Sequence, residues 1–469
     1  MAYKYDVLLK NGIIVDPVNN LEGVRDVGIK DGVIVEIAPE LNPAESKENF
    51  DLNGYYVVPG LVDLHIHASS WLGGRFGHKM MAQAGVTTAL DMSGPIDSVL
   101  DIARDYGVGL NLACINYVRP GHTVKDTNPG EGELETLLAE LLAKGAIGFK
   151  LLGGHYPLTP EATATAMEIA NKNKAYVAFH AGTTENGSNI EGFLEAINLA
   201  QGKCIHLAHI NAYCRGQVRS YLEETEVAIQ ALKDNPNISS EAYLSPVNGT
   251  SAECVDGIPQ SNVTKKCLEV GGFPATEKGL EEAIMAGWAQ INLESGGRVI
   301  LATGEEAVKF WRSCGTDCTV SFAVNFAEPR IRLATAKKDN GKFVVDCIST
   351  DGGGIPRNVT VEMGLALVKL EALTMKEFVL KASYNPAQIL GLKNKGHFTL
   401  GADADITVLD FEKQKPIMSL SNGRVIMYNG YVCGSGTHII TTAAGVDYVK
   451  ERGLETIVVD FNESTFYKK

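Results

Sequence analysis

The chain has 469 residues, of which 45% are hydrophobic and 21% are charged, so disordered and fibrous proteins are excluded. Its 42 Lys and Arg residues against 56 Asp and Glu residues give a net charge of −14, which argues against binding nucleic acid or an anionic membrane. Nine cysteines, an odd number spread along the chain, are typical of reduced thiols. Because the N-terminus has no apolar signal segment, we expect a cytoplasmic protein.

Both ends of the chain have the pattern of short β-strands joined by tight turns. Near the N-terminus, Asp31-Gly32 stands between two segments in which apolar residues alternate. Near the C-terminus, Asn429-Gly430 separates two further segments of the same kind. We therefore predict one small β-sandwich domain built from residues 1–58 and 398–469.

The middle of the chain, residues 59–397, alternates short apolar segments with amphipathic helical patterns, which is the order expected of repeated βα units. Eight such strands predict an α/β fold, a (β/α)8 TIM barrel. Residues 245–342 are too many for a loop, so we expect an excursion across the mouth of the barrel. The expected strands lie at 57–64, 86–92, 110–118, 147–152, 176–181, 204–210, 238–244 and 344–350.

Six polar residues stand at the C-terminal ends of the expected strands. They are His65, His67, Lys150, His180, His209 and Asp351. The first two form an H-x-H pair, and residues two apart on a strand point to the same side. Each of the six alone would be an ordinary core or loop residue, but catalytic groups of such barrels gather at this end. Imidazole and carboxylate ligands suit zinc and similar divalent ions, so the sequence predicts a metal site.

Lys150 cannot bind a cation as an ammonium group, because it would have no lone pair. Burial would lower its pKa and expose a nucleophilic amine. Reaction of that amine with carbon dioxide would give a carbamate whose two oxygens could bridge two metal ions. Two such ions could activate a bridging hydroxide and polarise a carbonyl group. The alternative interpretation is a buried lysine stem whose ammonium group reaches solvent.

Several motifs together resemble the amidohydrolase superfamily, in particular its branch with dihydroorotase, hydantoinase and allantoinase. They are PGLVDLHIH at 59–67, GAIGFKLL at 145–152, HLAHI at 206–210, TDGG at 350–353 and GADADITVLD at 401–410. The resemblance implies a TIM barrel with two divalent ions, zinc being the first choice. It also implies a homo-oligomer, either a dimer or a tetramer.

The same resemblance implies a role for each of the six polar residues. By this resemblance, the more buried ion would be held by His65, His67 and Asp351, and the second ion by His180 and His209. N-carboxylated Lys150 would bridge the two ions. Asp351 would also act as general base and then general acid. His206 competes with His209 for the place on the sixth strand, and we interpret His206 as a packing residue because it lies three residues earlier.

Four further residues are candidates for contact with the substrate. His155 and Tyr156 follow the bridging lysine, and one of them could donate to the oxyanion of a tetrahedral intermediate. They could equally be loop residues after a Gly-Gly turn. Arg357 and Arg330 could bind a substrate carboxylate through two parallel hydrogen bonds, or they could be structural arginines.

The resemblance leaves the substrate open. The first expectation is a binuclear metal-dependent hydrolase that uses a metal-bridging hydroxide to cleave the C–N bond of a cyclic amide, imide or ureide. The segment STDGGGIPRN at 349–358 instead resembles deacylases of linear N-acyl-D-amino acids, which is the alternative. A non-catalytic, hydantoinase-like scaffold is disfavoured because the set of metal ligands is full. A deaminase is disfavoured because its relatives bind one metal ion without a bridging lysine.

Overall fold

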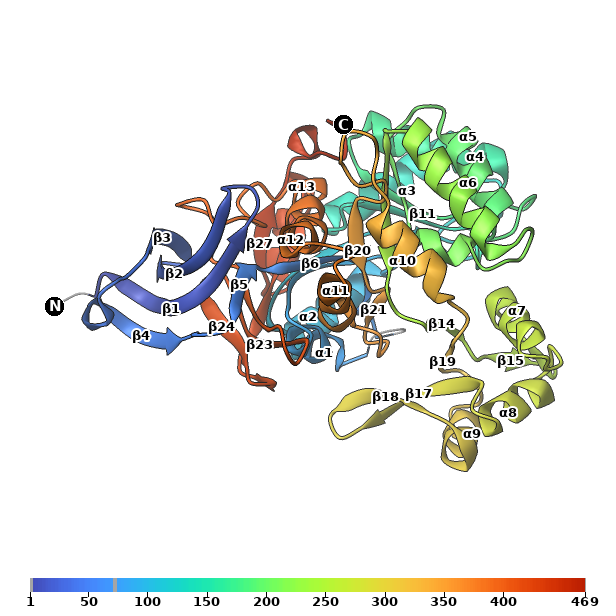
Figure 1. The fold of residues 1–469 in the computed structure, drawn as a ribbon. Coiled ribbons are helices and arrows are strands. Elements are labelled where there is room, and N and C mark those ends of the chain that lie inside the picture. The colour runs from blue at the N-terminus through green and yellow to red at the C-terminus, as the bar shows by residue number, and fades with distance from the viewer. Residues whose placement is uncertain (1–2, 71–73, 469) are drawn as a thin grey trace.

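The computed structural model describes residues 3–70 and 74–468. Within these residues the chain forms an α/β protein with three parts (Figure 1). These are a sheet built from both ends of the chain, two parallel sheets flanked by helices, and a separate unit drawn in yellow. None of the helices so described is both long enough and apolar enough to cross a membrane. The predicted α/β class is confirmed.

The sheet that combines both ends of the chain has nine strands among the described residues. They are β1 (Tyr5–Asp16), β2 (Leu21–Lys30), β3 (Val33–Ala38), β4 (Ser46–Asp51), β5 (Tyr56–Pro59), β22 (Ile406–Asp410), β23 (Lys415–Ser421), β24 (Arg424–Tyr428) and β25 (Tyr431–Val432). The order is β25-β24-β23-β22-β5-β1-β2-β3, with β4 beside β1. The two ends meet where Val408 of β22 lies opposite Val57 of β5. Hydrogen bonds link these strands into one sheet, where the sequence predicts a sandwich.

Two parallel sheets carry the strands predicted for the barrel. One contains β9 (Asn116–Val118), β10 (Gly148–Leu152), β11 (Tyr176–His180), β12 (Ile205–Leu207), β13 (Ile238–Tyr243) and β20 (Cys347–Ser349). The other contains β6 (Leu61–His67), β7 (Val86–Asp91), β8 (Val108–Cys114), β21 (Gly352–Gly353), β26 (Gly436–Thr441) and β27 (Glu455–Val458). Each of the eight predicted segments overlaps a strand. The pairing among the described residues gives two sheets, so the closed barrel stays a prediction.

The last two strands of the chain join a different sheet from the predicted one. β26 pairs in parallel with β8, and β27 pairs in parallel with β26. The prediction that residues 398–469 all join the N-terminal strands is therefore wrong for this segment. The neighbouring residues Ile439 and Ile440 are both buried, which fits a strand covered on both faces. A short apolar run does not itself identify its pairing partner, which explains the error.

Helices follow most strands of the two parallel sheets. Their bounds are α1 (Gly77–Gln83), α2 (Ile96–Tyr106), α3 (Glu131–Ala143), α4 (Pro160–Lys172), α5 (Ile190–Ala200), α6 (Tyr221–Asp234), α10 (Ala327–Thr335), α11 (Thr360–Lys369), α12 (Met375–Val379), α13 (Asn385–Ile389) and α14 (Val446–Glu451). Short 3-10 or π segments lie at Pro43–Glu45, Ile210–Tyr213, Leu380–Tyr384, Ala443–Gly445 and Phe461–Glu463. The local sequence determines where some of these helices begin. Ser220 and Glu223 form a capping box at the start of α6. Thr159 caps the start of α4, and Pro160 is its first residue.

The predicted excursion folds as a unit with its own core around Trp311 and Phe322. It contains β14 (Asn248–Ser251), β15 (Cys254–Val255), β16 (Ile258–Pro259), α7 (Asn262–Val270), α8 (Glu277–Met285), β17 (Ala289–Ser295), β18 (Arg298–Ala302), α9 (Gly304–Ser313) and β19 (Thr319–Phe322). Its β17–β18 hairpin reaches α1, where Lys79 Nζ donates to the Gly297 carbonyl at 3.1 Å. The helix α10 lies outside this unit, because it packs against α6 and β13.

Candidate metal centre

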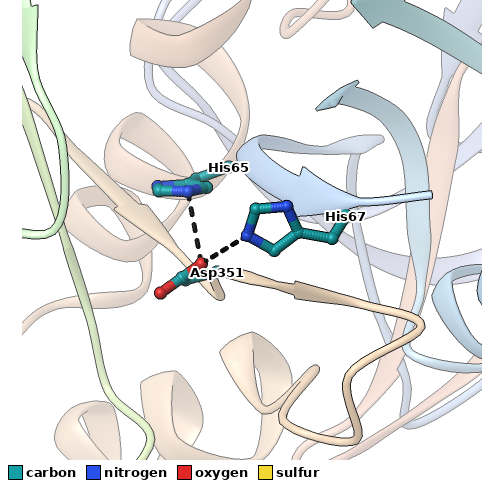
Figure 2. Close-up of side chains that lie close together, drawn as sticks. All are labelled: His65, His67 and Asp351. Carbon is teal, nitrogen blue, oxygen red and sulfur yellow. Dashed lines mark hydrogen bonds and ion pairs between the residues drawn. The ribbon is translucent and has the colours of Figure 1, made fainter. Parts of the chain in front are cut away.

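The H-x-H pair and Asp351 come together at the C-terminal end of β6. Asp351 Oδ1 lies 3.2 Å from His65 Nε2 and 2.9 Å from His67 Nε2 (Figure 2). Pairing of β21 with β6, which sets Gly353 opposite His67, brings the segment after β20 to this point. One ligand atom from each of the three side chains lies within 4.8 Å of the others. We call these three residues together, His65, His67 and Asp351, the carboxylate group.

A second group is formed by His180, the last residue of β11, and His209, which follows β12. His209 Nε2 lies 3.1 Å from His180 Nδ1, and the hydroxyl of Ser188 lies 2.7 Å from His180 Nε2. The rings of His65 and His209 stack with centroids 5.2 Å apart. This histidine pair is therefore adjacent to the carboxylate group, and together the two groups present five of the six predicted ligands.

Lys150, in β10, is 2% exposed, and its Nζ lies 3.6 Å from the sulfur of Met92. Burial lowers the pKa of Lys150 to about 8, although the charges of Asp351 and other carboxylates oppose this change. Among the described residues no carboxylate forms an ion pair with it. Burial therefore makes the unprotonated amine, the form that reacts with carbon dioxide, more accessible than in an exposed lysine.

Electrostatics prepare these side chains to bind a cation. Burial lowers the pKa of His65, His180 and His209 well below the ordinary value for histidine, so each ring is neutral at pH 7. Burial would raise the pKa of Asp351, but the guanidinium of Arg357 holds it well below its usual range. The centre therefore offers neutral imidazoles and an ionised carboxylate, which are the forms that bind metal.

The hydrogen bonds also fit a bound divalent ion. Glu241 Oε1 lies 2.7 Å from His65 Nδ1, so a neutral His65 donates there and turns an unprotonated Nε2 toward Asp351. His65 Nε2 and Asp351 Oδ1 are then both electron-pair donors, and they lie 3.2 Å apart. A cation between them would stabilise this arrangement, because both atoms could bind it.

The two candidates for oxyanion donor take different places. The rings of His155 and His180 lie edge to face with centroids 5.0 Å apart, and burial lowers the pKa of His155 to about 4. In contrast, the guanidinium carbon of Arg119 lies over the ring of Tyr156, 4.0 Å from the centroid of that ring. The structure thus brings His155 to the histidine pair and gives Tyr156 a cationic neighbour.

Both arginines predicted to bind substrate have partners within the protein. Arg357 is buried, and its Nη2 lies 2.7 Å from Asp351 Oδ2. Arg330 donates to the backbone carbonyls of Leu244 and Phe326. Arg357 is therefore an ion-pair partner of the carboxylate group, whereas Arg330 links the start of α10 to the end of β13.

Three neighbours of the centre were not predicted from sequence. Glu241 of β13 contacts both His65 and His209. Arg215 donates to the hydroxyl of Tyr243 at 2.9 Å, and Arg119 covers Tyr156. For Glu241 a signal existed, namely an acidic residue inside a strand expected to be buried.

Comparison with known proteins agrees with the fold and the motifs. Residues 56–256 and 274–433 match the amidohydrolase family. The dihydroorotase of Streptococcus pneumoniae serotype 4 is 25% identical over 417 residues, which cover 86% of this chain and 90% of that protein. The dihydroorotase of Aquifex aeolicus is 24% identical over 440 residues, covering 87% and 90% respectively.

Solved structures show the same fold. A D-aminoacylase structure superposes with a TM-score of 0.66 at 15% identity, covering 93% of this chain and 99% of that chain. A D-hydantoinase structure superposes with a TM-score of 0.61 at 18% identity, covering 92% and 98% respectively. The family match spans most of the sequence, including all six predicted ligands. The chain belongs to the amidohydrolase family.

Proposed function

We propose that the protein is a metal-dependent hydrolase that cleaves the C–N bond of a cyclic amide, imide or ureide. The observation that carries this proposal is the adjacency of the carboxylate group and the histidine pair, whose His65 and His209 rings are 5.2 Å apart. Relatives of the chain include dihydroorotases, and a D-hydantoinase shares the fold. A non-catalytic scaffold remains disfavoured because none of the six predicted ligands is replaced.

Two divalent ions, zinc as first choice, would be held by the six residues. His65, His67 and Asp351 would hold one ion, His180 and His209 the other, and N-carboxylated Lys150 both. Bound there, the ions would lower the pKa of a water molecule and polarise the scissile carbonyl. The D-aminoacylase that shares the fold also has a binuclear metal centre, in which one metal activates the enzyme and the second attenuates it.

Lys150 would acquire its carboxyl group by a simple addition. The neutral Nζ attacks the carbon of carbon dioxide, one N–C bond forms, and the nitrogen releases a proton to solvent. The product is an anionic carbamate with two oxygen donors. Burial supports this step, because a pKa of about 8 leaves about a tenth of the amine unprotonated at pH 7, far more than for an exposed lysine.

Asp351 would move the proton that the reaction requires. Its low pKa keeps the carboxylate ionised at neutral pH, ready to accept a proton from the attacking water. Oδ1 faces the histidines, and Oδ2 forms an ion pair with Arg357. From Asp351 the proton would pass to the leaving nitrogen. His155, beside the histidine pair, or Tyr156 would donate to the developing oxyanion.

A deacylase of linear N-acyl-D-amino acids is the second candidate, and a group of arginines favours it. Three arginines approach the end of β13. Arg215 donates to the Tyr243 hydroxyl, and Arg330 donates to the Leu244 carbonyl. The guanidinium of Arg357 lies 5.3 Å from the centroid of the Tyr243 ring. Of the three, only Arg357 has an ion pair among the described residues. Such surplus positive charge suits a substrate that carries a carboxylate.

A substrate panel separates the two candidates. Purified protein loaded with zinc in bicarbonate buffer is assayed with cyclic ureides, imides and lactams and with N-acyl-D- and N-acyl-L-amino acids. The proposal predicts ring opening of at least one cyclic substrate. Release of free amino acid without any ring opening would establish the deacylase instead. The expected dimer or tetramer is checked on the same preparation by light scattering.

A further inference from the structure

Glu241 is a buried carboxylate that contacts side chains and backbone from three other segments of the centre. It lies within β13 and its exposed fraction is 0%. Oε1 lies 2.7 Å from His65 Nδ1 and accepts from the backbone N–H of His209 at 2.6 Å. Oε2 accepts from the hydroxyl of Ser349. Because both oxygens are engaged, Glu241 is placed to orient other residues rather than to bind an ion itself.

The contact with His65 selects one form of the ring. A neutral imidazole carries one proton, and a carboxylate at Nδ1 draws that proton to Nδ1. Nε2, which lies 3.2 Å from Asp351 Oδ1, is then left with a free lone pair. In the other form Nε2 would donate to Asp351, and its lone pair would be lost to a metal ion.

The contact with His209 holds a strained backbone. His209 has a φ of 36° and a ψ of 61°, a left-handed conformation that costs free energy for a residue with a Cβ atom. The hydrogen bond from its N–H to Glu241 stabilises this conformation. In it, the ring points Nε2 at His180 Nδ1, 3.1 Å away.

We propose that Glu241 is a positioning residue that serves both ion sites at once, by fixing the tautomer of His65 and the backbone of His209. One carboxylate thus links the carboxylate group to the histidine pair. This inference rests on the proposed metal centre and is independent of the substrate. Carboxylates that accept from a ligating histidine commonly tune metal affinity by about 10- to 100-fold.

Two variants separate geometry from charge. In Glu241→Gln the amide oxygen can still accept from His65 and His209, and the amide N–H can donate to Ser349, but the negative charge is lost. In Glu241→Ala both the bonds and the charge are lost. The matched control is Glu224→Gln, because Glu224 is equally buried but, in the described part of the chain, accepts from loop amides alone, those of Gly216, Val218 and Arg219.

The first measurement is the tautomer of His65 in metal-free protein, from ¹⁵N imidazole NMR spectra. The second is zinc affinity, from competition with a chelator. For Glu241→Ala we expect His65 to move toward the Nε2–H form and the affinity of both zinc ions to fall by about 10- to 100-fold. Glu241→Gln should lose about tenfold, with the Nδ1–H form less dominant than in the wild type. Glu224→Gln should change neither quantity.

Wild-type tautomer and zinc affinity in Glu241→Ala would overturn the inference. If Glu241→Ala fails to fold, Glu241→Gln decides: a tenfold loss with Glu224→Gln unaffected supports the inference, and wild-type affinity overturns it. Wild-type protein that binds no zinc would contradict the proposed centre instead. The NMR measurement would then still test whether Glu241 sets the tautomer of His65.

Discussion

The carboxylate group and the histidine pair differ in charge. His65 and His67 share an ionised carboxylate, Asp351, whereas His180 and His209 are neutral rings that bond to each other and to Ser188. An anionic ligand attracts a divalent cation more strongly than a neutral one, so the carboxylate group should hold its ion more tightly. The histidine pair therefore depends on a further anion, which the carbamate of Lys150 would supply.

Removal of the Asp351 charge should have the largest effect on activity. Asp351→Asn keeps the shape of the side chain but cannot accept the proton, so we expect kcat to fall by about 10²–10⁴-fold. The ion at the histidine pair should remain bound. Steady-state kinetics together with elemental analysis test both statements. A loss below tenfold would move the acid–base role to another residue.

Removal of Lys150 should inactivate the enzyme and empty the histidine pair first. In Lys150→Ala the anion shared by both ions is missing, so we expect loss of one zinc and an activity at least about 10²-fold lower. A short carboxylic acid supplied with zinc should restore part of the activity by replacing the carbamate oxygens.

Lys381→Ala is the matched control for Lys150→Ala. Lys381 is also fully buried, and burial lowers its pKa to about 8, but its ammonium group bonds to the Val345 carbonyl away from the centre. The carboxylic acid should not affect this variant. Full activity of Lys150→Ala would rule out the bridging role.

The pH dependence should respond to Arg357. Its guanidinium lowers the pKa of Asp351, so Arg357→Met should raise that pKa. Because Asp351 must be ionised to accept a proton, the acid limb of the kcat profile should move up by about 1 to 3 pH units. Arg330→Met should leave the limb in place. An unmoved limb with a KM for N-acyl amino acids raised by tenfold or more would instead assign Arg357 to the substrate carboxylate.

Two serines offer the finest comparison of the sites. Ser93 Oγ lies 2.9 Å from His67 Nδ1, and Ser188 Oγ lies 2.7 Å from His180 Nε2. Each alanine variant removes one neutral hydrogen bond, so zinc affinity should fall by about 2- to 12-fold. Ser93→Ala should weaken only the tighter ion and Ser188→Ala only the weaker ion. Equal effects of both variants on both ions would argue that the sites are not distinct.

Much of this arrangement could be predicted from sequence because strands and their ends are local features. The H-x-H pair ends an apolar strand, and the direction of alternate side chains follows from strand geometry. In contrast, the ion pair between Arg357 and Asp351 depends on the conformation of the loop after β21, which the local sequence does not determine. The pairing of β26 with β8 is equally non-local. Glu241 was missed because an acidic residue in a strand does not show which side chains it will meet.

Zinc stoichiometry is the decisive measurement for the two-ion centre. The protein is loaded with zinc in bicarbonate buffer, freed of excess metal and analysed for zinc per chain, and a chelator is then titrated in. We expect two ions per chain that leave in two steps, the ion of the histidine pair first. No more than one zinc per chain under these conditions would contradict the bridged two-ion centre.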